Sequence, residues 1–351
     1  MKIKFRYVAL ILLIFAAVFA LSGCSGMNQG NHAGTGASDT KASEKTPDVK
    51  EAVMTPPEDQ SIESFVVPDG TTVIPAYAFS GFSALKEVTL PEGLTEIGQN
   101  AFDGCVSLET VVLPANLRVI KEEAFSECEA LKEAIIPDSV AEIGRGAFSG
   151  CTSLQKASLP SGMKSIPRDL FYGCEALTDV IMGDEVTEVG KSAFCDCKAL
   201  EHIDLPDGVT VIGELAFCDC KSLRTIRLPD GLTTLGEKSF YGTGLTEIAL
   251  PEHLLEIGER AFYVCEQLET VTFNNALTSI GNEAFFHTGI EEVVLPDSVS
   301  SVGEKTFLIC DSLKKFTVSK KTLDALAVAN DAAAIRSFFG LRDFAETFVT
   351  E

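Results

Sequence analysis

Histidine is scarce in this sequence, with four residues in 351. They are His32, His202, His253 and His287. The chain also has no G-x-S-x-G motif, no H-E-x-x-H motif and no glycine-rich phosphate loop after a strand. No cluster of residues suited to nucleophilic or acid–base chemistry is therefore evident. The sequence predicts a protein that is not an enzyme and that uses no metal and no cofactor.

Basic residues are few as well, with 28 Lys and Arg against 51 Asp and Glu, a net charge of −23. Such a surface repels nucleic acid and anionic lipid headgroups, and it favours solubility and cationic partners. Binding to nucleic acid is therefore excluded. A simpler interpretation is that the acidic faces only keep a long protein soluble.

One apolar run stands out, the 14 residues from Val8 to Leu21. It is too short to span a bilayer comfortably but fits the core of a signal peptide. Three basic residues precede it, Lys2, Lys4 and Arg6. Leu21-Ser22-Gly23-Cys24 follows it and resembles a bacterial lipobox, in which the cysteine is acylated and the bond before it is cut.

The lipobox predicts that residues 1–23 are a signal peptide and that Cys24 carries a diacylglyceryl group. Two acyl chains suffice for stable anchoring, so we expect a lipid-anchored protein at the cell membrane, exposed on the cell surface. Cleavage removes three basic residues and no acid, leaving 25 basic and 51 acidic residues and a net charge of −26. An uncleaved anchor helix and a plain secretory signal remain as alternatives.

Residues 24–60 contain Gly, Asn, Ser, Thr, Asp, Lys and Pro with almost no large apolar side chain. Such a segment cannot offset the entropy of its own ordering. It is predicted to be a flexible tether between the lipidated cysteine and a folded body.

The body is periodic. A phenylalanine, usually preceded by alanine, recurs every 23 residues, with two steps of 22, at Phe79, Phe102, Phe125, Phe148, Phe171, Phe194, Phe217, Phe240, Phe262, Phe285 and Phe307. Eleven units result, and a degenerate strand at residues 62–67 precedes them. Such a period indicates a repeat architecture rather than several globular domains.

Each unit predicts one turn of a solenoid. In the unit that begins at Leu85, the pattern L-x-x-V-x-L places Val88 and Leu90 on one face of a strand. Pro91-Glu92-Gly93 then forms a turn, Leu94–Ile97 is a second short extended piece, and the Ala-Phe segment is a tight or helical turn. Burying about eight inward side chains stabilises a unit by roughly 1.5–3 kcal/mol each. Ordering the backbone costs ~1–2 kcal/mol for each of the unit's residues. A lone unit would not fold, whereas stacked units share a core.

The order Leu, Pro, Ile-Gly, Ala-Phe and Cys resembles the leucine-rich repeats of BspA-like surface proteins over residues 61–319. This resemblance implies a repeat solenoid of about 23 residues per turn, right-handed, with a parallel β-sheet on one face and short or helical turns on the other. It also implies adhesion-type binding of a protein ligand, either a host matrix protein or a bacterial surface protein, and no catalytic residues.

Eight of the eleven cysteines lie three residues after the repeat phenylalanine: Cys105, Cys128, Cys151, Cys174, Cys197, Cys220, Cys265 and Cys310. Two units have Thr-Gly in this place instead, which favours a ladder of buried free thiols. Cys195 and Cys218 are additional. Together with Cys197 and Cys220 they could form a four-thiolate zinc site, which the differing directions of the side chains disfavour. A disulfide between Cys195 and Cys218 is a further alternative.

The exposed strand face is the candidate ligand-binding site. Between the second and third apolar strand positions it carries Val112, Ile135 and Ile181, and beside them, on adjacent central strands, His202, Asp204, Arg224 and Arg227. Apolar anchors beside a charged rim suit a protein contact. The alternative interpretation is that the β-branched residues only favour strand formation and that Asp204–Arg227 is an ordinary cross-strand pair.

The repeat stops after Ser319, and residues 320–351 contain an apolar series compatible with a helix. A solenoid needs its last coil covered, so a C-terminal helical cap and a monomer are expected. Dimerisation through Phe338, Phe339 and Phe344 is the alternative.

Overall fold

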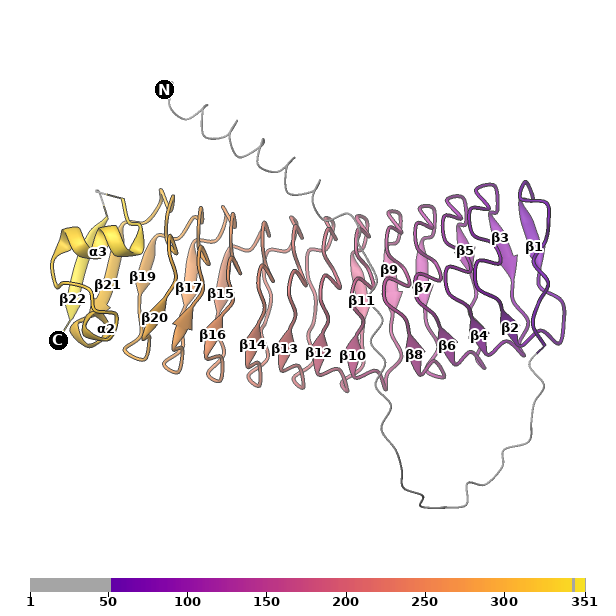
Figure 1. Ribbon diagram of the computed structural model, residues 1–351, viewed down its shortest axis with the longest axis horizontal. Coiled ribbons are helices and arrows are strands. Elements are labelled where there is room, and N and C mark those ends of the chain that lie inside the picture. Colours follow the sequence, from indigo (N-terminus) through magenta and orange to yellow (C-terminus); the bar gives the residue numbers. More distant parts are fainter. Residues whose placement is uncertain (1–51, 343–344, 351) are drawn as a thin grey trace, which may run out of the picture. The chain divides into compact units, whose positions relative to one another are not determined.

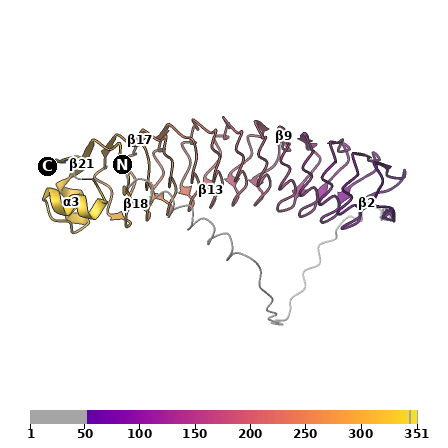
Figure 2. The same ribbon diagram turned by 90° about the horizontal axis from the view of Figure 1, so that it is seen from above.

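Each repeat forms one coil of a solenoid, and the coils stack along a single axis (Figures 1 and 2). This computed structural model describes residues 52–342 and 345–350. The predicted signal peptide, Cys24, most of the predicted tether and Phe344 lie outside the described residues. Within the described part of the chain, no helix is long and apolar enough to cross a membrane.

The L-x-x-V-x-L segments form the first ladder of parallel strands. Successive strands pair in register, so that Glu87 lies opposite Ser64 on one side and Thr110 on the other. The strands are β1 (Ser64–Val66), β3 (Glu87–Thr89), β5 (Thr110–Val111), β7 (Glu133–Ile135), β9 (Lys156–Ser158), β11 (Asp179–Ile181), β15 (Glu247–Ala249), β17 (Thr270–Thr272), β19 (Glu292–Val294) and β21 (Lys315–Ser319).

A second ladder of two-residue strands follows the Pro turns (Figure 1). A glycine ends most of these strands because the coils approach closely there: a Cβ on Gly98 would lie 2.6 Å from the backbone nitrogen of Ala76. The strands are β2 (Val73–Ile74), β4 (Glu96–Ile97), β6 (Val119–Ile120), β8 (Glu142–Ile143), β10 (Ser165–Ile166), β12 (Glu188–Val189), β13 (Val211–Ile212), β14 (Thr234–Leu235), β16 (Glu256–Ile257), β18 (Ser279–Ile280) and β20 (Ser301–Val302).

The Ala-Phe segments are turns rather than helices. In one coil, Ala101 N donates to Gly98 O, Asp103 N to Asn100 O and Cys105 N to Phe102 O. Asn100 and Gly104 both have left-handed backbone angles, with φ of 52° and 69°. Such residues interrupt a helix after a single turn, so the chain reverses here without forming one.

The repeat phenylalanines form a continuous stack through the core. All eleven are buried, and the centroids of neighbouring rings are 5.0–6.1 Å apart. The widest step, 6.1 Å, joins Phe148 to Phe171, and the rings on both sides of Phe171 are tilted by 26°. Leu170 replaces the usual alanine there. The stack is therefore looser where a larger side chain sits beside it.

The C-terminal part is only partly helical. Helices α2 (Lys320–Ala325) and α3 (Ala332–Phe339) are followed by strand β22 (Glu346–Thr350), which pairs in parallel with β21. The prediction of helix over residues 320–351 misses this strand. Phe339 is buried against Phe316, with ring centroids 4.7 Å apart. Phe339 therefore covers the last coil, whereas Phe338 is 36% exposed.

At the other end, the first coil is covered by residues that fall within the range predicted to be tether. Val53 forms a parallel bridge with Val73, and Met54 is buried. Residues 52–54 therefore pack onto the solenoid.

Candidate functional site

The outward side chains of the first ladder form one row along the solenoid. Strand register places Ile135 next to Ser158 and Ser158 next to Ile181. Val112 is 82% exposed, Ile135 47% and Ile181 50%. Neighbouring strands lie ~4.8 Å apart, so these three predicted residues share one stretch of surface. Isolated exposed apolar residues are ordinary, but an aligned set is a candidate contact surface.

The predicted polar residues lie on the next two coils. His202 Nε2 and Asp204 Oδ1 are 2.8 Å apart within one coil, and Arg227 pairs with Asp207 of the preceding coil. The cross-strand pair Asp204–Arg227 considered from the sequence is therefore replaced by these two pairs. All of these side chains are exposed, so their mutual attraction adds little stability and the groups are accessible to a partner.

The prediction that these polar residues lie on strands is wrong. Residues 201–206 and 223–229 have no strand assignment, and the first ladder is interrupted between β11 and β15. Arg224 N lies 3.5 Å from Glu201 O, whereas the equivalent bonds of other coils, such as Lys86 N to Glu63 O, measure 2.8–3.2 Å. The two central coils are therefore less tightly joined on the first-ladder face. The second ladder, by contrast, continues unbroken from β10 to β20.

Arg224 turns toward the following coil. Its guanidinium donates to Gly244 O at 3.4 Å, and the residue remains exposed. It thus flanks the row of Asp204 and Arg227 rather than lying in it.

Ion pairs between neighbouring coils lie along the side of this row where the strands begin. Lys86 binds Glu63 at 2.8 Å, Lys132 binds Glu109 at 2.6 Å, and other pairs of the same kind are Lys156–Asp179, Lys314–Glu291 and Lys315–Glu292. These pairs occupy most of the basic residues of the face. At the centre of the face, His202 instead pairs within its own coil and Arg224 donates to a backbone carbonyl.

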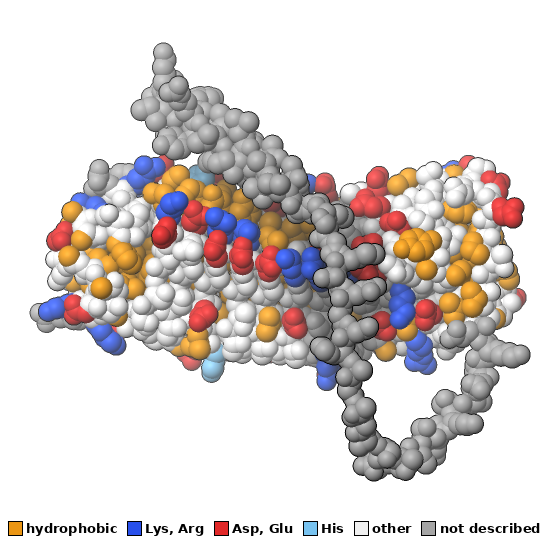
Figure 3. All heavy atoms as spheres, in the orientation of Figure 1, with side chains coloured by type: hydrophobic (Ala, Val, Ile, Leu, Met, Phe, Trp, Pro, Cys, Tyr) orange, Lys and Arg blue, Asp and Glu red, His pale blue; other side chains and the backbone are white. Residues whose placement is uncertain are grey.

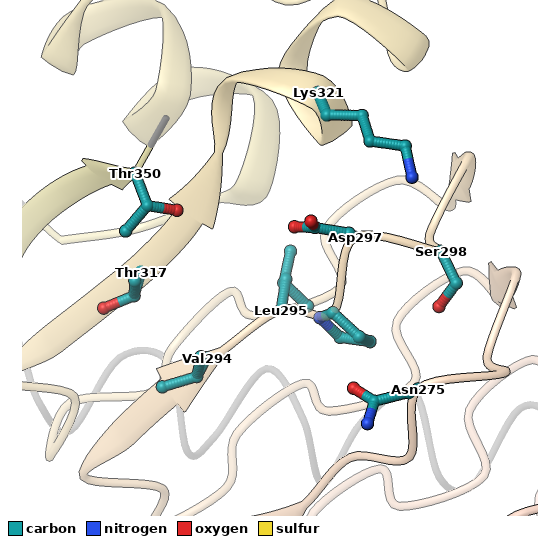
Figure 4. A pocket seen from close by; sticks show the side chains of 9 residues that line it. Asn275, Val294, Leu295, Asp297, Ser298, Thr317, Lys321 and Thr350 are labelled. Atoms are coloured by element: carbon teal, nitrogen blue, oxygen red, sulfur yellow. The ribbon is translucent and has the colours of Figure 1, made fainter.

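A groove of about 420 Å³ lies at the C-terminal end of the same face (Figure 4). Val294, Thr317 and Thr350 come from the neighbouring strands β19, β21 and β22, and Lys321 comes from α2. Asn275, Leu295, Pro296, Asp297 and Ser298 complete the lining. The groove offers hydroxyl, amide and charged groups beside the apolar side chains of Val294, Leu295 and Pro296.

Sequence reasoning missed this groove and both ends of the row. Val66 is 70% exposed and continues the row at one end, while Phe348, paired with Thr317, continues it at the other. Val66 belongs to a degenerate repeat whose spacing could have placed it. Phe348 follows the repeats, and only its β-favouring neighbours Thr347, Val349 and Thr350 hint at a strand.

The ladder cysteines are core residues. Each of the eight thiols donates to the carbonyl of the phenylalanine one coil earlier, over 3.0–3.3 Å, as Cys105 does to Phe79. In the two Thr-Gly units, Thr243 and Thr288 contact the next thiol through their hydroxyls at 3.2 Å. All ten cysteines from 105 to 310 are buried free thiols.

The four sulfurs considered for zinc point in different directions. Cys197 and Cys220 donate into the core, whereas Cys195 and Cys218 lie beside the carboxylates of the residues that follow them. Within residues 52–342 and 345–350, no group of three or more His, Cys, Asp or Glu side chains is placed to hold a metal ion.

Charged side chains also pair on another face. In the view of Figure 3, hydrophobic side chains lie beside a line of acidic and basic side chains that crosses the upper half of the coils carrying β12 to β20. Lys191–Glu214 and Arg260–Glu283, both at 2.6 Å, are ion pairs between neighbouring coils. Charges paired in this way stabilise the surface that they occupy and leave little unpaired charge for a ligand.

One known protein family matches the repeats of this chain. The family model described as BspA type leucine rich repeat region matches residues 58–178, 118–243 and 233–329. No curated protein sequence matches the chain.

Two solved structures share the fold. A leucine-rich repeat protein from Bacteroides ovatus has a TM-score of 0.51 at 22% identity, with 83% of this chain and 85% of that chain covered. A leucine rich cell surface protein from Faecalibacterium prausnitzii has a TM-score of 0.53 at 23% identity, with 80% and 91% covered. No enzymatic family is indicated by these matches. Leucine-rich-repeat solenoids generally present surfaces for binding proteins, and this chain belongs to the BspA-type leucine-rich-repeat family.

Proposed function

We propose that the protein is a lipid-anchored adhesin of the cell surface that recognises a protein ligand through the first-ladder face of the solenoid. The observation that carries this proposal is the aligned exposed row of Val112, Ile135 and Ile181 beside the polar residues of the two central coils. Hydrophobic anchors with a charged rim are the usual composition of a protein contact.

The central polar residues supply specificity. Arg227 and Asp207 are exposed and can exchange their mutual ion pair for one with a ligand at small cost. Exposed charges of this kind steer association and set register more than they set affinity. The apolar residues supply the buried area.

Val112→Asp combined with Arg227→Glu is expected to abolish detectable ligand capture, a loss of about tenfold to hundredfold in affinity, because hot-spot residues carry 1–3 kcal/mol or more. The measurement is a crosslinking pull-down with the mature protein against host matrix proteins and against proteins of the cell's own envelope. Captured proteins are then compared between wild type and variant.

A matched control lies outside the first-ladder face. Leu255 is 50% exposed and Lys164 is exposed, and both precede strands of the second ladder. Leu255→Asp with Lys164→Glu makes the same change of apolarity and charge there and should leave capture intact. If the first variant captures its partners as well as wild type while its circular dichroism is unchanged, the first-ladder face is not the binding site.

The anchor is tested separately at Cys24. Cells given a tagged fatty acid are expected to label the wild-type protein, and Cys24→Ser should remove the label, because the thiol that carries the acyl chains is gone. Ser38→Ala, within the predicted tether, is the control. A wild-type protein that stays unlabelled and keeps residues 1–23 would point to an uncleaved anchor helix instead.

The alternative function is a structural scaffold that organises the envelope and has no host ligand. Capture restricted to the cell's own envelope proteins would favour it, whereas capture of a host matrix protein would favour the adhesin.

A further inference from the structure

Two thiols lie outside the cysteine ladder. Cys195 and Cys218 directly follow Phe194 and Phe217, and so they occupy the same position on neighbouring coils. They are 5% and 7% exposed, whereas the eight ladder cysteines are 0–2% exposed. Of the ten cysteines in the described residues, these two are the nearest to solvent.

The backbones that carry them are directly joined. Asp196 N donates to Cys218 O at 2.8 Å, and the rings of Phe194 and Phe217 stack at 5.4 Å. Paired neighbouring backbones lie ~4.7–4.9 Å apart, which falls within the range of about 4.4–6.8 Å between the Cα atoms of a disulfide. The two thiols therefore lie on directly adjoining backbones, at a spacing that a disulfide can bridge.

Their surroundings differ from those of the ladder thiols. The Sγ atoms of Cys195 and Cys218 lie 3.9 Å and 3.6 Å from carboxylate oxygens of Asp196 and Asp219. These two carboxylate side chains are 28% and 27% exposed. The thiols thus lie just beneath partly exposed polar groups, whereas the ladder thiols are enclosed by the core.

We propose that Cys195 and Cys218 form an oxidation site, at which thiol–disulfide exchange with an external disulfide covalently links the two central coils. One of the two sulfurs attacks the external disulfide, forms a mixed disulfide and displaces one thiol. The other, resolving sulfur then attacks the first and displaces the second thiol. The pair loses two electrons and two protons, and the two released thiols gain both.

The disulfide would link the two coils where the hydrogen bonding of the first ladder is weakest. The coils of Phe194 and Phe217 continue into residues 201–206 and 223–229, which have no strand assignment. The bond between Arg224 N and Glu201 O is 3.5 Å long between the same two coils. A covalent link would hold these coils together where backbone pairing does so poorly.

The test is oxidation of the folded, fully reduced protein with oxidised glutathione. The expected product has lost the mass of two hydrogen atoms and two reactive thiols, and its digest contains Cys195 linked to Cys218. Amide hydrogen exchange at Arg224 should slow after oxidation and recover on reduction. Cys218→Ser should instead retain one glutathione on Cys195, because the resolving sulfur is gone.

The matched control is the ladder pair Cys151 and Cys174, also on neighbouring coils but 0% exposed. Cys151→Ser should not change the oxidation product, whereas Cys195→Ser should abolish it. The proposal is overturned if the folded protein does not lose two hydrogens under conditions that oxidise the unfolded chain, or if ladder cysteines are linked as readily. Both outcomes are independent of whether a ligand binds the first-ladder face.

Discussion

Phe194→Ala is expected to lower the free energy of unfolding by about 3–5 kcal/mol, the usual cost of emptying the site of a buried phenylalanine. Phe194 is fully buried and stacks between Phe171 at 5.7 Å and Phe217 at 5.4 Å. A solenoid coil contacts only its neighbours, so its stability depends on the interfaces to either side. Loss of this ring weakens two interfaces in the middle of the stack.

The pattern of unfolding should distinguish a middle coil from an end coil. In Phe194→Ala, urea unfolding should broaden or separate into two transitions, since the coils before and after residue 194 are no longer strongly coupled. Phe79→Ala removes an equally buried ring with only one neighbour in the repeat stack, Phe102 at 5.0 Å. It should reduce amide protection in the first coils alone.

Phe194→Leu separates the cavity from the stacking, because most of the buried volume is retained. This variant should lower the free energy of unfolding less than the alanine variant does, and its urea unfolding should remain a single transition. Identical exchange patterns in Phe194→Ala and Phe79→Ala would contradict coupling through neighbouring coils and would indicate one cooperative unit.

The repeat was predictable because its signals are periodic. Phe79 to Phe307 mark every coil, and the ladder cysteines mark most of them, so register, core and strand position follow from spacing. The exposed positions of Val112, Ile135 and Ile181 were confirmed for the same reason. Because the pattern recurs eleven times, an ambiguous residue in one unit does not change the prediction for the others.

Features without a period were harder to predict. β22 was missed because residues 345–350 occur once, and their pairing with β21 depends on contacts that α2 and α3 set up. The interrupted ladder at residues 201–206 was missed because its sequence still matches the repeat. The distance between coils there is a property of stacking and is not visible in a single unit. The partners of Asp204 and Arg227 were mistaken for a related reason, since long exposed side chains choose among several neighbours.

The buried thiols predict a steep loss of stability at alkaline pH. Burial raises the pKa of Cys105 to about 12 and that of Cys265 to about 11, from an ordinary value of 9.0. It raises the pKa of Cys128, Cys174 and Cys197 well above that value too. In the folded protein these thiols therefore stay protonated at a pH where an unfolded chain has lost their protons.

The direction of the pH dependence of stability follows from proton binding. Between pH 9 and 11 the unfolded chain binds fewer protons than the folded chain, so a rise in pH favours unfolding. The contribution is fully present below pH 9 and is lost as the pH approaches the raised values. Each buried thiol removes about 1.4 kcal/mol for each pH unit in this window. Several such thiols would exhaust a typical stability of about 5–15 kcal/mol, and cooperative unfolding is expected before pH 11.

Changing Cys128, Cys151 and Cys174 together to serine tests this cause. A serine hydroxyl can donate to a phenylalanine carbonyl, as Thr243 and Thr288 do at 3.1 Å to that of their own coil, yet it does not titrate in this range. The triple variant should show a pH dependence smaller by roughly 4 kcal/mol per pH unit, measured by urea unfolding under reducing conditions. An unchanged slope would mean that other groups, such as the half-buried Tyr172, Tyr241 and Tyr263, cause the alkaline unfolding, since burial raises their pKa as well. The ladder hydrogen bonds would then stabilise the coils without making them sensitive to pH.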